Sequence, residues 1–172
     1  TLVYNNGAGS TVSTEWNSSG GSAGAGVPQN VTVQQGTITM PATARTVPGN
    51  LTFNGGGMAL SSGGDLSVKG TLALGASNIT TATGSKVILP VAASLTRSTG
   101  YVVGNLQKNV ATGSGVSRTF EIGDAGNYTP VDVTLASVSS AGDLLASTAV
   151  PGIPPAAGMP PTGSGISQTK YV

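Results

Sequence analysis

Cysteine and histidine are both absent from this 172-residue chain. Without them it cannot form a disulfide framework, a thiolate or imidazole metal site, or a Ser-His-Asp triad. Charged residues make up only 8% of the sequence and aromatic residues only 4%, whereas charged residues are roughly 25% of an average soluble domain. Any core must therefore be thin and mainly aliphatic.

The low charge also narrows the possible partners. A net charge of +1 leaves no basic patch, so we expect neither nucleic acid nor an anionic membrane surface as a partner. No apolar run approaches the ~20 residues that a membrane-spanning helix needs, so we expect no membrane insertion. A nearly neutral surface favours association between copies of a protein. The start at Thr1 rather than Met fits a processed mature form, and a shortened chain is the alternative.

A repeat of about 20 residues is the most informative feature. The segment VPQNVTV at 27–33 recurs as VPGNLTF at 47–53 and, more loosely, as VKGTLAL at 68–74. Division at these points gives three coils, at 30–49, 50–70 and 71–90. Repeats of this length are typical of solenoid proteins.

Stacking the three coils places their apolar residues in columns. The columns are Val31, Leu51 and Leu72; Val33, Phe53 and Leu74; Ile38, Met58 and Ile79; and Val47, Val68 and either Leu89 or Val87. Apolar residues within a coil are spaced by two, as in a strand, and are followed by turn-forming Gly, Ser, Asn or Pro. We therefore predict an all-β fold with a short parallel β-helix of about three triangular coils. A meandering antiparallel sandwich is the alternative.

The pattern changes after residue 90. Longer strand candidates at 101–110, 118–122, 128–138 and 144–150 alternate and are separated by Gly-containing turns. We expect an antiparallel β-sheet or sandwich module over 91–150. An N-terminal arm and cap at 1–29 would precede the coils. A Pro/Gly-rich connector and a terminal strand, at 151–172, would follow the module.

Several phrases resemble large secreted β-helix proteins of bacterial surfaces. NLTFNGGG at 50–57, DLSVKGTLALG at 65–75 and NITTATGSKVIL at 78–89 are similar to filamentous-haemagglutinin and autotransporter-passenger coils. The segment at 100–148 resembles a module that follows such coils in those proteins. The resemblance implies an extracellular or cell-surface structural role and brings no catalytic residues with it.

Carboxylates offer little for catalysis. The acidic residues are Glu15, Asp65, Glu121, Asp124, Asp132 and Asp143. Only Glu121 and Asp124 are close in sequence, and Asp65 is alone in the three coils, so no carboxylate pair for glycoside cleavage is predicted. Ser85 and Lys86 are adjacent rather than facing. We expect no enzyme activity and no catalytic residue.

Metal and phosphate sites are equally unsupported. The loop 124–127 offers fewer oxygens than the 6–8 that calcium requires, so it is interpreted as a turn. The glycines at 55–57 are not followed by the Gly-Lys-Ser/Thr of a phosphate loop. We expect no cofactor and no bound metal.

The two ends of the chain carry the functional hypothesis. A strand edge exposes unpaired N–H and C=O groups, and short β-prone segments can add to such an edge. The segments Leu2–Asn5 and Ile166–Val172 are candidates, and the predicted assembly residues are Leu2, Val3, Tyr4, Ile166, Tyr171 and Val172. Trp16 is predicted to cap the first coil.

A subunit of an extracellular bacterial filament or surface fibre is the function predicted from the sequence, with further copies of the chain as the partner. A monomeric adhesin or glycan-binding surface module, with surface glycans as partner, is the alternative. A β-helix enzyme acting on polysaccharides is a third possibility, which the missing carboxylates disfavour.

Overall fold

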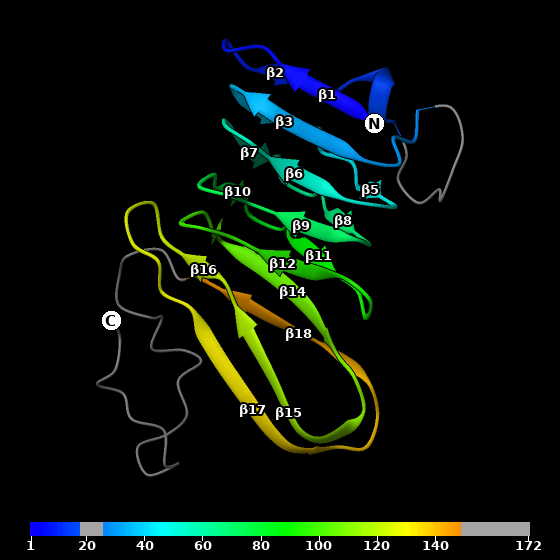
Figure 1. The fold of residues 1–172 in the computed structure, drawn as a ribbon, viewed down its shortest axis with the longest axis vertical. Coiled ribbons are helices and arrows are strands. Elements are labelled where there is room, and N and C mark those ends of the chain that lie inside the picture. Colours follow the sequence, from blue (N-terminus) through cyan, green and yellow to red (C-terminus); the bar gives the residue numbers. More distant parts are fainter. Residues whose placement is uncertain (18–25, 149–172) are drawn as a thin grey trace.

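The protein is described here by a computed structural model that covers residues 1–17 and 26–148. Stacked parallel sheets form a β-solenoid of about 4 turns, and antiparallel strands follow it. Figure 1 shows the short strands stacked along the long axis, with the N-terminus at one end and the hairpin of residues 113–138 projecting from the other. The predicted β-helix followed by antiparallel strands is confirmed.

Sheet A is five-stranded and forms the first side of the solenoid. All its neighbouring strands are parallel. In spatial order it contains β1 (Leu2–Asn5), β3 (Val31–Gln35), β6 (Leu51–Phe53), β9 (Thr71–Ala73) and β12 (Ser94–Thr96). Its two edge strands, β1 and β12, therefore lie at opposite ends of the solenoid.

Sheet B is six-stranded and also entirely parallel. It contains β2 (Ser10–Thr11), β4 (Thr37–Thr39), β7 (Gly57–Leu60), β10 (Ile79–Thr81), β13 (Val102–Val103) and β16 (Ile122–Gly123). Sheet B thus extends one strand further than sheet A at the C-terminal end, because β16 pairs with β13.

Sheet C completes the triangle with five strands. It contains β5 (Arg45–Val47), β8 (Leu66–Val68), β11 (Val87–Leu89), β14 (Asn105–Val110) and β18 (Gly142–Ser147). Its pairs are parallel except the last, in which β18 runs antiparallel to β14. A separate two-stranded antiparallel sheet is formed by β15 (Gly113–Phe120) and β17 (Val131–Val138).

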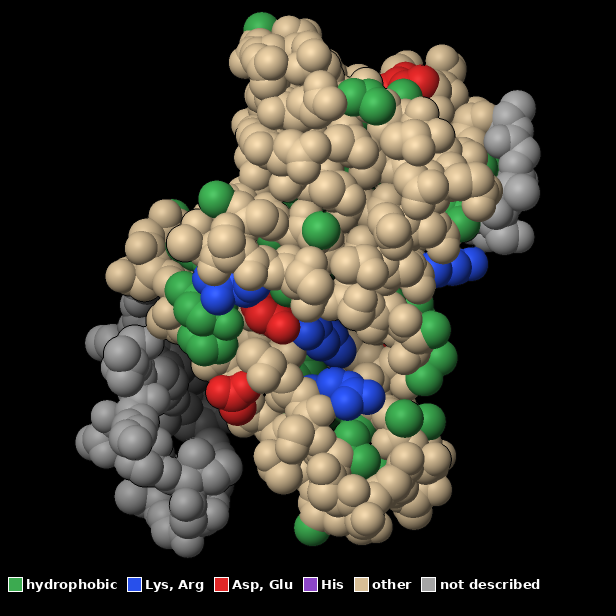
Figure 2. Space-filling model, viewed as in Figure 1, with side chains coloured by type: hydrophobic (Ala, Val, Ile, Leu, Met, Phe, Trp, Pro, Cys, Tyr) green, Lys and Arg blue, Asp and Glu red, His purple; other side chains and the backbone are tan. Residues whose placement is uncertain are grey.

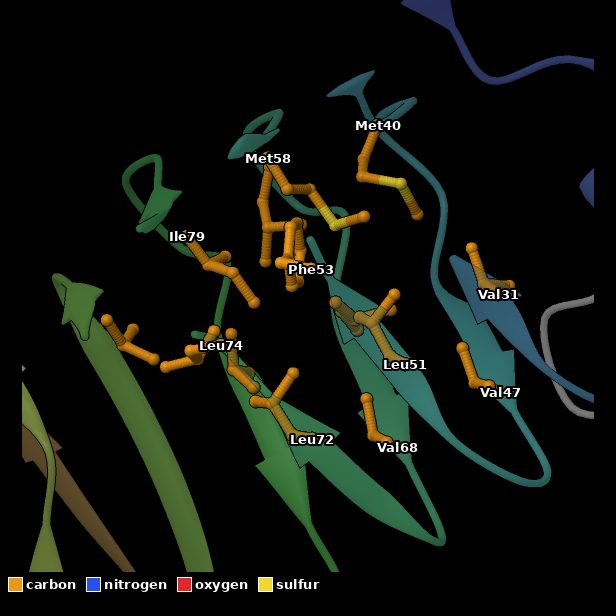
Figure 3. Packing of buried hydrophobic residues seen from close by; sticks show 14 of the residues in the cluster. Val31, Met40, Val47, Leu51, Phe53, Met58, Val68, Leu72, Leu74 and Ile79 are labelled. Carbon is orange, nitrogen blue, oxygen red and sulfur yellow. The ribbon is translucent and has the colours of Figure 1, made fainter. Parts of the chain in front are cut away.

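The predicted columns form the core. Val31 pairs with Leu51 and Leu51 with Leu72, while Ile38 pairs with Met58 and Met58 with Ile79. All but Met58, which is 2% exposed, are fully buried. Figure 3 shows Leu51, Leu72, Met58 and Ile79 converging from two sides of the triangle. Burying each such aliphatic side chain contributes about 1.5–3 kcal/mol, so a core nearly free of aromatics can hold the stack together.

The repeated asparagine has a structural role at one corner. Asn30 Oδ1 accepts a hydrogen bond of 2.8 Å from the N–H of Asn50, and Asn50 Oδ1 accepts one of 2.9 Å from the N–H of Thr71. Another corner requires glycine, since Gly56 has φ +71° and a Cβ there would lie 2.0 Å from the carbonyl oxygen of Gly36. The repeat thus encodes corners as well as core positions.

The domain boundaries expected from the sequence need correction. The solenoid does not end at residue 90, because β12, β13 and β14 continue the parallel ladders on β9, β10 and β11. The solenoid also begins before residue 30, since β1 and β2 pair in parallel with β3 and β4. Equivalent residues on sheet A are 20 and 21 apart in the first coils. At the last coil the separation becomes 23 on sheets A and B and 19 on sheet C, so a fixed repeat length does not find it.

Candidate functional site

The N-terminal end of the solenoid is closed on one of its three sides. Its first coil has β1 in sheet A and β2 in sheet B, but a 3-10 helix, η1 (Thr14–Trp16), takes the place of a strand on sheet C. Trp16 is fully buried, and its Nε1–H donates a 3.1 Å hydrogen bond to the carbonyl oxygen of Thr46 on β5. The side chain covers the edge strand of sheet C, the position expected of a cap.

A buried arginine, missed from the sequence, supports this cap. Arg45 pairs with Leu66 and so occupies an apolar column position, yet it is only 9% exposed. Its Nε–H donates to the carbonyl oxygen of Trp16 at 2.6 Å, and its Nη1–H donates to Thr43 Oγ1 at 2.6 Å. In the sequence, Arg45 aligns with the apolar Leu66 and Val87 of the next coils. This mismatch could have indicated that the coil of Arg45 differs from those that follow it.

Tyr4 and Glu15 tie β1 to the same cap. The Tyr4 hydroxyl donates to Glu15 Oε1 at 2.9 Å. Burial and the adjacent Glu15 raise the pKa of Tyr4 well above its ordinary value. Burial opposes ionisation of Glu15, but hydrogen bonds from its own N–H, the N–H of Ser13 and the Tyr4 hydroxyl, together with Arg45, lower its pKa. Tyr4 is thus engaged within its own subunit.

The segment Leu2–Asn5 is an edge strand rather than a free arm. The N–H of Leu2 donates to the carbonyl oxygen of Asn30 at 2.8 Å, so this residue faces β3. Consecutive N–H groups along a strand point to opposite sides, so the N–H and C=O of Val3 face away from β3. Val3 is 49% exposed. Among the predicted assembly residues of this segment, Val3 therefore presents the open edge.

The C-terminal end is open on a different side. Beyond the last full coil, sheet B gains β16 and sheet C gains β18. In the described part of the chain, no strand pairs with the outer side of β12 in sheet A. The final coil is therefore complete on two sides and vacant on the third.

A groove of about 310 Å³ borders the start of β12. It is lined by Leu89, Pro90, Val91, Ala93, Ser94, Leu95, Lys108, Asn109 and Arg118. Val91 is 67% exposed, the most exposed of the large hydrophobic side chains in the described residues. Apolar side chains beside an unpaired strand edge are the features of a strand-binding site.

Charged contacts hold the hairpin next to this groove. Lys108 Nζ lies 2.5 Å from Glu121 Oε2 and donates to the carbonyl oxygen of Thr119 at 2.7 Å, while Arg118 Nε–H donates to the carbonyl oxygen of Asn109 at 3.1 Å. Figure 2 shows that the charged side chains on this face gather mainly at its lower half, whereas the upper coils are almost uncharged. The side of the groove that the hairpin provides, through Arg118, is therefore held against the solenoid.

The residues considered for chemistry have structural partners. Asp124 Oδ1 accepts hydrogen bonds from the N–H groups of Gly126 and Asn127 at 2.8 and 2.7 Å, which lower the pKa of Asp124 and define a turn. The Ser85 hydroxyl donates to the carbonyl oxygen of Ala82, while Lys86 pairs with Asp65 at 2.7 Å.

Within residues 1–17 and 26–148, no group of three or more acidic side chains is placed to hold a metal ion. The same residues include no helix with the length and apolarity needed to cross a bilayer. The predicted assembly residues Ile166, Tyr171 and Val172 lie outside the described residues.

The site thus consists of a capped N-terminal end and a C-terminal end with an open edge and groove. Leu95 and Val91 belong to this C-terminal end and were not predicted from the sequence, although the column of Leu51 and Leu72 continues directly into Leu95. Comparisons of the chain with protein-family models, with curated proteins and with solved structures each found no match.

Proposed function

We propose that this protein is a structural subunit of an extracellular bacterial filament or surface fibre. Copies of the chain are its partners, and they assemble by β-strand addition or by stacking of sheet edges. The location follows from the resemblance to secreted bacterial β-helix proteins, and the solenoid acts as a scaffold rather than as a catalyst.

One observation carries this proposal: within the described residues, sheet A ends in an unpaired parallel edge at each end of the solenoid, β1 and β12. Such edges bind further strands unless they are blocked by charge, proline or a covering element. Neither Leu2–Asn5 nor Ser94–Thr96 contains a charged residue or a proline. The scarcity of charge removes the repulsion that keeps many proteins apart.

Imaging of the purified chain tests the proposal. Negative-stain electron microscopy and size-exclusion chromatography over a wide concentration range are expected to show polymers that grow with concentration. A monodisperse particle of 16.7 kDa at every concentration and ionic strength would contradict it.

A glycan-binding surface module is the second candidate, and Tyr128 is the observation that favours it. This aromatic ring is 37% exposed. Arg97 lies 3.7 Å from its centroid and Tyr101 packs beside it at 5.7 Å, which holds the ring in place. A glycan array with the unmodified chain and Tyr128→Ala tests this candidate, which requires saccharide binding that the variant loses.

A further inference from the structure

Within the described residues, sheet A lacks one strand that its two neighbouring sheets have at this end. At the level below β12, sheet B is occupied by β16 and sheet C by β18, so the two neighbouring sides of that coil already exist. The chain passes this level as β15, which pairs with β17 and not with β12. A strand beside β12 would complete the coil.

The backbone of β12 is oriented to receive such a strand. The N–H of Ser94 donates to the carbonyl oxygen of Gly70 at 3.2 Å, and the carbonyl oxygen of Thr96 accepts from Leu74 at 2.9 Å. These groups face β9, so the N–H and C=O of Leu95, which lies between them, face the vacant side. One donor and one acceptor are thus presented at the middle of the strand.

The side chain of Leu95 shows the same vacancy. It continues the column of Val31, Leu51 and Leu72, all of which are fully buried. Leu95 is only partly buried, because no described strand covers it from the next level. An added strand with an apolar residue in this register would finish its burial.

We propose that residues 166–172 of a second copy insert beside β12 as this missing strand. The inference rests on the proposed function and identifies its acceptor site. The segment Ile166–Val172 combines β-prone Ile, Thr, Tyr and Val with a single lysine and no proline, a composition suited to an added strand.

Insertion of one strand fits the end of the solenoid better than coil-on-coil stacking. If β1 of a second copy paired directly with β12, its β2 would fall at the level that β16 already occupies. Figure 1 also shows the hairpin of β15 and β17 projecting past the last coil, where a coaxial copy would lie. A single tethered strand avoids both conflicts.

The connecting sequence is long enough to carry the strand to a second copy. Seventeen residues, five of them proline, separate Thr148 from Ile166. A proline-rich segment extended at ~3.1 Å per residue spans about 50 Å. Joining subunits requires a donor from another chain, so the proposed function makes a second copy the donor.

Cysteine cross-linking tests the insertion, and the chain has no native cysteine to interfere. One full-length chain carries Ser94→Cys on β12. A second, differently tagged, carries Ser167→Cys, Thr169→Cys or Tyr171→Cys. After mixing and oxidation, we expect a disulfide-linked pair containing both tags for at least one of the three positions. Ser137→Cys, an exposed position on the hairpin, replaces Ser94→Cys as the matched control and should give at least tenfold less product.

A variant and an intramolecular version complete the test. Leu95→Pro in the Ser94→Cys chain removes the outward N–H and should abolish the cross-link, with the β circular dichroism spectrum as a check on folding. A chain carrying both cysteines that cross-links only within itself would overturn insertion from a second copy. Polymers that form without a cross-link at any position would overturn insertion beside β12 and leave the proposed function standing. If no polymer forms at all, both the insertion and the proposed function are refuted.

Discussion

The two ends of the solenoid solve the problem of an unpaired sheet edge in different ways. At the N-terminal end Trp16 covers β5 and donates to Thr46, so sheet C is closed by a side chain from the same subunit. At the C-terminal end β18 adds an antiparallel strand to sheet C, but no described strand pairs with the outer side of β12 in sheet A, next to the exposed Val91.

This difference separates stability from assembly. Residues around Trp16 are buried and hydrogen-bonded within the subunit, so changing them should mainly unfold it. Residues around Leu95 are partly exposed and incompletely paired, so changing them should mainly affect what the subunit binds. The predictions below test whether the two ends can be separated in this way.

The largest expected effect is on the N-terminal cap. Trp16→Ala should lower the free energy of unfolding by about 3–5 kcal/mol, because it leaves a cavity and removes the donor to Thr46. Chemical denaturation followed by circular dichroism measures this. Tyr128→Ala removes a partly exposed aromatic that contacts Arg97 and Tyr101 near the other end. It is the control and should cost about 1–2 kcal/mol. Equal losses for the two variants would show that Trp16 is not a cap.

A smaller effect is expected at Arg45. Arg45→Ala should cost about 2 kcal/mol, because the buried carbonyl oxygen of Trp16 loses its donor. Arg45→Leu should cost less than Arg45→Ala, since leucine fits the column of Leu66 and Val87. The same denaturation experiment compares them. If the leucine variant is the less stable of the two, the guanidinium holds the cap mainly through its hydrogen bonds.

A pH profile tests the link between β1 and the cap. Because the pKa of Tyr4 is raised in the folded state, its contribution to stability is complete below its ordinary pKa of 10.0 and is lost as the pH rises above that value. Because the pKa of Glu15 is lowered, its contribution is complete above its ordinary pKa of 4.5 and is lost as the pH falls below that value.

Thermal melts across this range should therefore show losses at both extremes. Tyr4→Phe should reduce the alkaline loss and Glu15→Gln the acidic one. Profiles that keep the shape of the unmodified protein's profile in both variants would disprove the link.

The smallest effect is expected at the outer face of β1. Val3→Lys changes a half-exposed side chain, so the free energy of unfolding should change by less than about 0.5 kcal/mol. If assembly uses strand insertion at β12, filament formation should also be unchanged, as judged by light scattering. Loss of filaments in this variant would instead indicate stacking through β1.

Much of the solenoid could be predicted because core and corner positions repeat together. Columns such as Val31, Leu51 and Leu72 repeat an aliphatic residue at spacings of 20 and 21, so they show in the sequence. The last coil could not be predicted in the same way, since its spacing changes to 23 on sheets A and B and 19 on sheet C, and β15 leaves the stack. The vacancy next to Leu95 arises from pairing between β15 and β17, and such long-range pairing has no local signal.

Filament formation by Leu95→Pro is the most direct test of the central claim, that copies of this chain join at the open edge of β12. The unmodified chain, Leu95→Pro and Leu145→Lys are imaged together by negative-stain electron microscopy, with circular dichroism as the folding check. Leu145→Lys also alters an exposed leucine, on β18, and should leave filaments intact. The account predicts filaments for the unmodified chain and Leu145→Lys and none for folded Leu95→Pro, and equal filaments for all three would contradict it.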